Sequence, residues 1–213
     1  MTRMIFVRHG QSTGNLAGRF LGHYDGALTD LGREQARCAA KYLRDKQIDI
    51  AYASDLSRAY ETGRIIAAPH GLVPIKDKNL REVFAGKWEN AEFTEIERLY
   101  PDDWHMWQNN IFASRPTGGE SVAELAIRVT SEIWKLAAVN DGKTVLIATH
   151  ATPIRALMRE WMTIGALKDG PKWVANASVT TAEYDARHHA IKVGKVSECS
   201  YLDGMVTDIP DNV

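Results

Sequence analysis

Cysteine is scarce in this sequence: Cys38 and Cys199 lie far apart and lack the C-x-x-C spacing of zinc and redox sites. We therefore expect neither a disulfide scaffold nor a metal site. No apolar run approaches the roughly 20 residues that a membrane-spanning helix requires. A surplus of charge is missing too, since 26 lysines and arginines face 27 aspartates and glutamates. This balance gives no indication of a nucleic-acid or membrane partner.

The first apolar run begins almost at the N-terminus and leaves no room for a signal peptide, so we expect a cytoplasmic protein. The 213 residues are enough for one domain with a substantial core. We expect a single domain over residues 1–213 that contains a cap-like insertion at about residues 83–118. The sequence does not indicate an oligomeric state.

Short apolar runs alternate with helical patterns along the chain. Apolar residues between 36 and 43 recur at helical spacing, and Ser121 with Glu124 forms a capping box before another helix. This alternation predicts an α/β fold, with a mainly parallel sheet and helices on both faces. We expect strands at residues 5–7, 48–53, 73–75 and 143–149, a helix at 30–46, a C-terminal β-hairpin at 179–184 and 190–196, and a poorly ordered tail after residue 202.

Aromatic residues crowd the segment between residues 80 and 117, where the helical pattern loosens and Pro101 and Pro116 interrupt it. We expect short helices there that cover the functional edge of the sheet. Most of the aromatics should form a small satellite core, with one or two lining a pocket. They are Trp88, Phe93, Tyr100, Trp104, Trp107 and Phe112.

Two of the buried strands end in a histidine, His9 and His150. If these strands are parallel neighbours, both imidazoles reach the same sheet edge, where open α/β sheets bind ligands. Arg8 lies beside His9, and Arg58 falls in the first turns of a following helix. Burying such groups is costly unless an anion meets them, which favours a receptor for a tetrahedral oxyanion. The alternative is a strand that ends in a surface loop without a function.

Five short motifs connect this interpretation to a family. They are Arg8-His9-Gly10, Ser54-x-x-x-Arg58-Ala-x-x-Thr62, Leu80-x-Glu82, Gly119-Glu120-Ser121 and Thr149-His150-x-x-Pro153-Ile-Arg155. In order and spacing they resemble the phosphatase branch of the histidine phosphatase (phosphoglycerate mutase-like) superfamily, over roughly residues 4–160. Five motifs in register are much more specific than any one of them.

The resemblance implies a phosphohistidine intermediate at His9 and no cofactor. Arg8, Arg58 and His150 would hold the phosphoryl oxygens, and Asn15 would help to position the phosphate. Arginine beside histidine should lower the imidazole pKa through like charge, which keeps the ring neutral and nucleophilic.

The resemblance also implies a general acid at Glu82. An alkoxide is a poor leaving group, so it needs a proton, and the same carboxylate could afterwards deprotonate the attacking water. The alternative for Glu82 is a surface carboxylate that pairs with Arg81 or Lys87. In that case Glu89 or Glu92 would be the next candidate for the acid.

Three departures from the family pattern concern the substrate side. Ala151 and Thr152 follow the second histidine where the family usually has glycines, and the backbone N–H of Ala151 can still face phosphate. Leu21 stands where a polar residue is frequent, and we expect Leu21 and Gly22 to contact substrate. The segment 84–90 contains one extra residue.

Hydrolysis of a small phosphomonoester is therefore the favoured function. The alternative is a cofactor-dependent phosphoglycerate mutase, which resembles the first third of this chain. Mutases of this family carry a longer insertion whose cations hold the carboxylate of phosphoglycerate, whereas residues 83–119 offer only scattered Lys87, Arg98 and Arg115.

A further alternative is a non-catalytic phosphoprotein-binding module, which loss of a histidine or of the acid would favour. Neither is lost here.

Overall fold

The computed structural model describes residues 1–170 and 173–207, and its centre is a six-stranded sheet in the order β4-β3-β6-β1-β7-β8. The four strands from β4 to β1 run parallel, and β7 and β8 form an antiparallel hairpin at one side. The predicted α/β fold is confirmed. The strands are β1 (Thr2–Arg8), β3 (Ile50–Ser54), β4 (Ile75–Asp77), β6 (Thr144–Thr149), β7 (Val179–Asp185) and β8 (Ala190–Val193).

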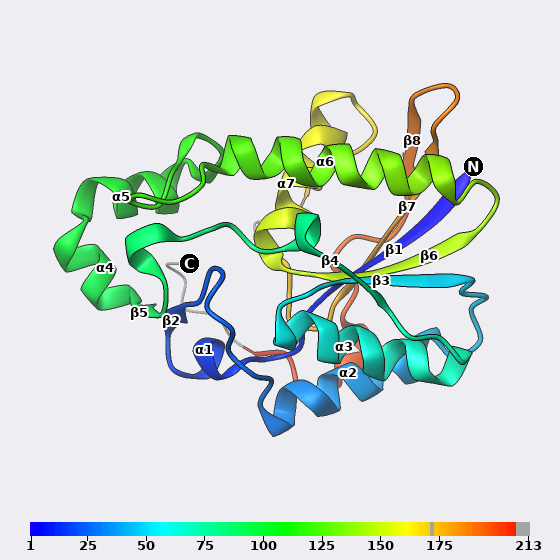
Figure 1. The fold of residues 1–213 in the computed structure, drawn as a ribbon, viewed down its shortest axis with the longest axis horizontal. Helices are drawn as coiled ribbons and strands as arrows, with labels where there is room; N and C mark the ends of the chain where they lie inside the picture. The colour runs from blue at the N-terminus through cyan, green and yellow to red at the C-terminus, as the bar shows by residue number, and fades with distance from the viewer. Residues whose placement is uncertain (171–172, 208–213) are drawn as a thin grey trace.

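Helices cover both faces of the sheet (Figure 1). One face carries α2 (Asp30–Leu43) and α3 (Ser57–Ala67), and the other carries α6 (Val122–Val139) and α7 (Ala151–Thr163). Strand side chains alternate between the faces. Phe6 of β1 therefore packs in the cluster under α6 and α7, while Val7 belongs to the cluster under α2 and α3.

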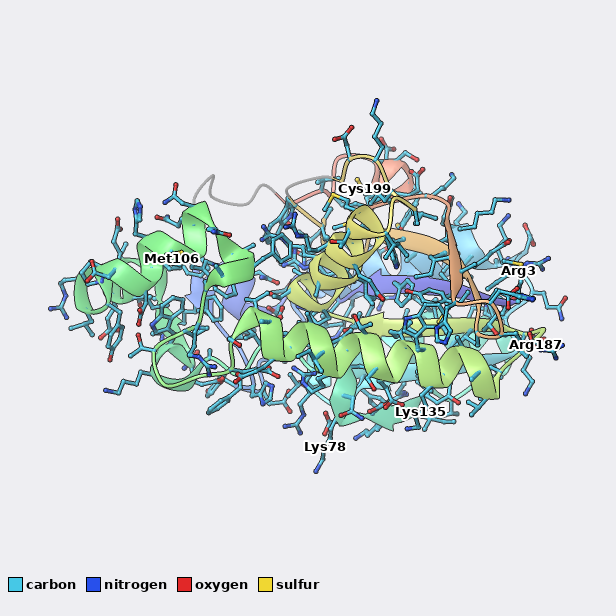
Figure 2. All side chains as sticks on the ribbon, turned by 90° about the horizontal axis from the view of Figure 1, so that it is seen from above. Arg3, Lys78, Met106, Lys135, Arg187 and Cys199 are labelled. Carbon is cyan, nitrogen blue, oxygen red and sulfur yellow. The ribbon has the colours of Figure 1, made fainter. Side chains whose placement is uncertain are left out.

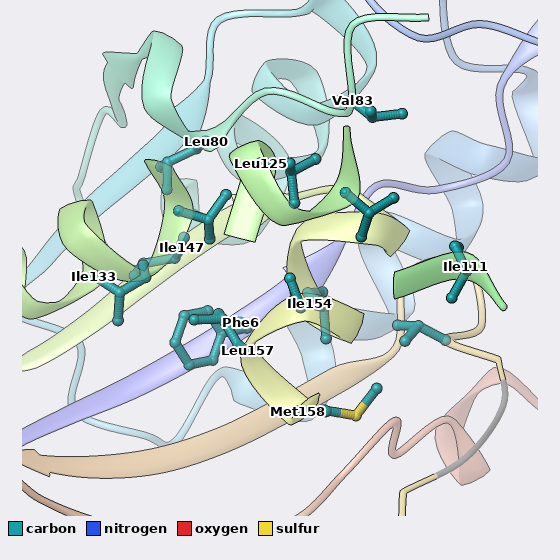
Figure 3. Packing of buried hydrophobic residues seen from close by; sticks show 14 of the residues in the cluster. Phe6, Leu80, Val83, Ile111, Leu125, Ile133, Ile147, Ile154, Leu157 and Met158 are labelled. Carbon is teal, nitrogen blue, oxygen red and sulfur yellow. The ribbon is translucent and has the colours of Figure 1, made fainter. Parts of the chain in front are cut away.

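The larger core cluster lies under α6 and α7. Figure 3 shows Phe6 and Ile147 of the sheet facing Ile154 and Leu157 of α7. These four side chains are fully buried. Burial of apolar side chains of this size contributes roughly 1.5–3 kcal/mol each, so this face holds the two histidine-bearing strands firmly against α7.

The insertion lies at the end of the sheet where β1 runs into the short helix α1 (Thr13–Leu16) (Figure 1). A small second sheet of β2 (Arg19–Phe20) and β5 (Ala91–Glu92) joins it to the loop after α1. Three short helices complete it, namely α4 (Phe93–Leu99), α5 (Pro101–Asn109) and the 3-10 turn η4 (Ile111–Ala113).

The aromatic residues of the insertion mostly form a satellite core, as predicted. Trp88, Trp104 and Trp107 are at most 5% exposed, and Phe20 meets Trp107 edge-on with ring centroids 5.0 Å apart. This packing extends the molecule beyond the sheet. Figure 2 shows Met106 of α5 at the opposite end from Arg3.

Several predicted boundaries shift by a few residues. The edge strand begins at Ile75, after Pro74, which has no N–H to donate to a neighbour. Helix α2 ends at Leu43 instead of residue 46. In the tail, the carbonyl of Met205 accepts a hydrogen bond from the Gln35 side chain, and the Thr207 hydroxyl donates to the Asn176 side chain. Residues 208–213, which belong to the tail expected to be poorly ordered, lie outside the described residues. None of the helices in the described part combines the length and apolarity that crossing a bilayer would need.

Close backbone contact between α2 and the loop after β1 predicts that Gly32→Ala is destabilising. A Cβ at Gly32 would lie 2.0 Å from the carbonyl oxygen of Gln11, so the helix would have to move. We expect the free energy of unfolding to fall by about 1–3 kcal/mol, measured by urea denaturation. The control is Gly170→Ala, whose Cβ would meet nothing closer than 3.5 Å. Equal stability of the two variants would contradict this packing.

Candidate active site

The two histidines that end strands meet at one edge of the sheet. Strands β1 and β6 are parallel neighbours in which Arg8 pairs with Thr149, so the next residues, His9 and His150, emerge together. The backbone N–H of His9 donates to the carbonyl of Thr149 at 2.9 Å, and the two imidazole centroids are 5.2 Å apart. Both side chains are buried.

The hydrogen bonds of His9 fix which ring nitrogen is free. Nδ1 lies 2.7 Å from the carbonyl oxygen of Gly10, which can only accept, so Nδ1 carries the proton. Burial, reinforced by Arg58 and Arg8, holds the pKa of His9 well below its usual value. The neutral ring therefore keeps an unprotonated Nε2, the form that attacks phosphorus.

His150 has one satisfied and one unsatisfied nitrogen. Its Nε2 lies 2.8 Å from the hydroxyl oxygen of Ser54, while Nδ1 is buried without a hydrogen-bond partner among the described residues. Burial, with Arg58 and His9, holds the pKa of His150 well below its usual value too. If the Ser54 hydroxyl donates to Nε2, Nδ1 carries the ring proton and can donate to an incoming oxyanion.

Arg8 and Arg58 are buried cations held by backbone carbonyls. Arg8 Nη1 donates to Val174 at 2.6 Å, and Arg58 donates to Gly22 at 2.7 Å and to Tyr24 at 3.0 Å. Neither forms a salt bridge within the described residues, and the Nε of Arg8 has no partner there. Burial lowers the pKa of Arg8 to about 9 and that of Arg58 to about 10. A bound dianion would relieve this cost.

Asn15 and the start of α7 complete the polar surface of the pocket. The amide oxygen of Asn15 accepts from the N–H and hydroxyl of Ser12 at 3.0 and 2.9 Å, so its NH₂ group is the part that can donate to a ligand. Ala151 opens α7 with His150 as the N-cap residue. The backbone of Ala151 is helical, so this position does not require the glycine that the family usually has. Helix N-termini bind anions, and the N–H of Ala151 lies at this one.

Glu82 lies on the loop opposite, half-buried, with its carboxylate in the same pocket. One oxygen accepts from Val83 N–H at 2.9 Å and the other faces Thr152 N–H at 3.4 Å. Arg81 pairs instead with Asp55, through two bonds of 2.6 Å. Glu82 is therefore not the surface partner of Arg81 that the sequence left open.

The two other candidate acids are engaged elsewhere. The Glu89 carboxylate accepts the backbone N–H groups of His23, Tyr24 and Ala85 at 2.8, 2.5 and 2.8 Å. Glu92 pairs with Arg19 at 2.8 Å. Glu89 therefore holds the turn at residues 22–24. Because its carboxylate already accepts three backbone N–H groups, it is a poorer candidate for the general acid than Glu82.

A second ion pair holds the Glu82 loop from α6. Arg128 donates to both carboxylate oxygens of Glu120 at 2.9 and 2.7 Å, and to the carbonyls of Asn79, Arg81 and Glu82 at 2.8, 3.2 and 3.3 Å. The Glu120 of the Gly-Glu-Ser motif thus orients Arg128, and Arg128 fixes the backbone on which Glu82 stands.

One cavity is lined by all the predicted substrate-binding residues except His150, which is fully buried with its ring centroid 5.2 Å from that of His9. Leu21 and Gly22, which we expect to contact substrate, line it, and Phe93 and Trp107 are the two aromatics of the insertion that reach it. His105 of α5 is exposed and does not line it. The cavity is lined by Arg8, His9, Ser12, Asn15, Arg19, Phe20, Leu21, Gly22, Arg58, Glu82, Phe93, Trp107, Ala151, Thr152, Arg155 and Trp173.

Trp173 and Arg155 are pocket residues to which the sequence assigned no role. The Trp173 ring stacks under the Arg8 guanidinium, 4.4 Å from its centroid. No motif marks Trp173, because it comes close only through the long connection between α7 and β7. Arg155 was visible as the last residue of the Thr149-His150 motif, four residues into α7.

A sequence profile of the histidine phosphatase superfamily (branch 1) matches residues 4–196. The chain belongs to this superfamily. Phosphoserine phosphatase 1 of Hydrogenobacter thermophilus is 29% identical over 191 residues, covering 90% of each chain. A 2,3-bisphosphoglycerate-dependent phosphoglycerate mutase of Gloeobacter violaceus is 34% identical over 166 residues, covering 75% of each. The structure of mycobacterial glucosyl-3-phosphoglycerate phosphatase with VO3 superimposes with a TM-score of 0.81 at 28% identity, over 92% of this chain and 98% of that one.

The lowered pKa values of this phosphatase's two buried histidines predict a loss of stability on mild acidification. Unfolding restores ordinary pKa values of about 6.5, so the unfolded state binds more protons between the folded pKa and about pH 6.5. The free energy of unfolding is fully present above about pH 6.5 and falls below it, by up to about 1.4 kcal/mol per pH unit for each histidine.

Urea denaturation at about pH 7.5 and about pH 5.5 measures this slope. We expect His9→Ala to remove about half of it, and His105→Ala, on the exposed side of α5, to leave it unchanged. A wild-type protein equally stable at both values would contradict the buried, neutral state of the pair.

Proposed function

We propose that this histidine phosphatase hydrolyses small phosphomonoesters through a phosphohistidine formed at Nε2 of His9. The observation that carries the proposal is that the buried His9 and the guanidinium groups of Arg8 and Arg58, which form no salt bridge within the described residues, line one cavity, with the ring of His150 5.2 Å from that of His9. A phosphoryl group supplies the negative charge and the geometry that these donors fit.

In the first step, Nε2 of His9 attacks phosphorus in line with the leaving oxygen. Arg8, Arg58 and the Nδ1–H of His150 would stabilise the equatorial oxygens, together with the start of α7. Glu82, protonated, would donate its proton to the leaving alkoxide, so that the alcohol departs neutral. Residues 79–85 hold this carboxylate over the cavity.

In the second step, water attacks the phosphohistidine and Glu82, now ionised, would accept its proton. The P–N bond breaks, His9 returns to its neutral form, and inorganic phosphate leaves. The Nδ1–H bond to Gly10 keeps the ring in one orientation through both steps. Small phosphorylated metabolites are the substrates named for two of the relatives, which supports this substrate size.

Mutase activity is the second candidate, because a named mutase is among the relatives. Of the three cations that the insertion offers, Arg115 pairs with Glu124, and Lys87 and Arg98 are not among the residues that line the cavity. Release of inorganic phosphate from a panel of phosphomonoesters distinguishes the two. Interconversion of phosphoglycerates without net phosphate release would establish the mutase.

Trapping the intermediate tests the chemistry. Wild-type protein quenched during turnover should carry an acid-labile phosphate that His9→Ala lacks, which also distinguishes the enzyme from a non-catalytic phosphoprotein-binding module.

For Glu82→Gln we expect turnover to fall about 10²- to 10⁴-fold with vanadate affinity largely kept. Unchanged turnover in Glu82→Gln would remove the acid role from this residue.

The hydrogen bonds of Arg128 predict that this residue positions the Glu82 carboxylate without lining the cavity itself. Arg128→Gln removes three bonds to the loop of Glu82, so we expect kcat to fall about tenfold or more while vanadate affinity changes little. The matched control is Arg115→Gln, which breaks an exposed pair with Glu124 on the same helix. If both variants lose the same activity, or if Arg128→Gln loses vanadate affinity in parallel, the loop is not positioned in this way.

A further inference from the structure

The backbone carbonyl of His9 accepts two hydrogen bonds from the loop that precedes β7. The side-chain NH₂ group of Asn176 donates to it at 2.9 Å, and the backbone N–H of Ala177 donates to it at 3.1 Å. Asn176 is 2% exposed, and neither residue is among those that line the cavity. Asn176 therefore contacts His9 through its backbone and not from the side on which a substrate would bind.

The peptide group between His9 and Gly10 is held at both of its polar atoms. Its carbonyl accepts from Asn176 and Ala177, and its N–H donates to the hydroxyl of Thr62 at 3.1 Å. The next carbonyl, that of Gly10, accepts from Nδ1 of the His9 ring at 2.7 Å. The orientation of the imidazole thus depends on a peptide group whose rotation the bond from Asn176 opposes.

The same NH₂ group of Asn176 also reaches Asn15, because an amide nitrogen has two hydrogens to donate. Nδ2 of Asn176 lies 3.3 Å from Oδ1 of Asn15. Asn15 and Ser12 form the capping box that begins α1, so this bond attaches α1 to the end of β1. Asn15 lines the cavity, and its own NH₂ group forms no hydrogen bond with the described residues. One amide group therefore sets the spacing between His9 and a donor that faces the cavity.

The contacts of Asn176 leave its amide group a single orientation. Its Nδ2 faces two oxygens that can only accept, and its Oδ1 accepts from the hydroxyl of Thr207 at 2.9 Å. A flipped amide would place an oxygen against both acceptors. The neighbouring Ala177 has a φ of 55°, an unfavourable conformation for a residue with a Cβ, which persists where the surrounding structure holds it. In this conformation both groups donate to one carbonyl.

Resting on the phosphatase function proposed above, we propose that Asn176 is a positioning residue of the reaction. It fixes the ring of His9 and the amide of Asn15 relative to each other, and thereby aligns the phosphoryl group for in-line attack. A small displacement of either group would reduce the rate strongly, because in-line attack requires close alignment of the reacting atoms. Asn176 acts through these two residues and does not touch the substrate.

Asn176→Ala tests this role. The variant loses both bonds, while the N–H of Ala177 still satisfies the carbonyl of His9, so we expect a folded protein. On the phosphomonoester that the wild-type protein hydrolyses fastest, we expect kcat to fall about tenfold or more. The affinity for inorganic phosphate, measured by calorimetry, should fall about 2- to 10-fold, as expected when one hydrogen bond is weakened.

Asn140→Ala is the matched control. Asn140 is also buried, at 3% exposure, and its Nδ2 donates to Leu136 at 2.9 Å and to Tyr52 at 3.4 Å. It precedes β6, at the end of that strand opposite His150. We expect both variants to lose stability in urea, and only Asn176→Ala to lose kcat and phosphate affinity. An unchanged kcat in Asn176→Ala, or an equal loss in both variants, would overturn the proposal.

A double-mutant cycle with Asn15→Ala distinguishes positioning from a general loosening of the site. If Asn176 acts on phosphate through Asn15, its replacement in the Asn15→Ala protein should change phosphate affinity by less than about twofold. The same replacement should still lower kcat, because the bond to His9 is lost in either background. Additive losses of phosphate affinity would exclude the contact through Asn15.

Failure of the proposed function gives a different result. In that case no phosphomonoester releases phosphate from the wild-type protein, whereas binding of inorganic phosphate is measured without turnover. A cycle that is non-additive in phosphate affinity then supports the positioning of Asn15 by Asn176, and an additive cycle overturns it.

Discussion

Burial of positive charge without a salt bridge to any described carboxylate is the constraint on which this site depends. Arg8 and Arg58 are at most 3% exposed, and backbone carbonyls take the place of carboxylates around them. Carbonyl dipoles hold a guanidinium in place but leave its charge only partly compensated. The parallel pairing of β1 with β6 brings two buried imidazoles to the same edge of the sheet. Burial lowers their pKa and therefore favours the neutral ring. This arrangement is costly, and in the proposed function the phosphoryl group of the substrate would supply the counter-charge.

The sheet and its histidines could be predicted because their signals are local. Apolar runs that stop at Arg8-His9 and Thr149-His150, with caps before the helices, fix strand order well enough to bring both rings to one edge. The pairing of β2 with β5 joins residues some seventy positions apart in the chain and has no local pattern. The role of Trp173 in the pocket could not be predicted from the sequence for the same reason, because only the tertiary structure brings it into contact with Arg8.

The choice among nearby carboxylates shows where sequence reasoning ends. Glu82, Glu89 and Glu92 lie within eleven residues, and composition cannot separate them. The fold does, because Glu89 accepts three backbone N–H groups of a turn and Glu92 pairs with Arg19, whereas the Glu82 carboxylate stays in the cavity. Motif spacing pointed to Glu82, and hydrogen-bond accounting explains why its neighbours are not equivalent.

The bonds from Arg58 to the carbonyls of Gly22 and Tyr24 tie the two halves of the cavity together. The guanidinium that faces the phosphoryl position also builds the turn beside Leu21, against which an alcohol would rest. A substitution that moves this turn would therefore move the guanidinium of Arg58 with it. Phe93 and Trp107 line the same cavity and form no hydrogen bond with Arg58 among the described residues, so a change in either would alter the cavity wall without removing a bond of this guanidinium.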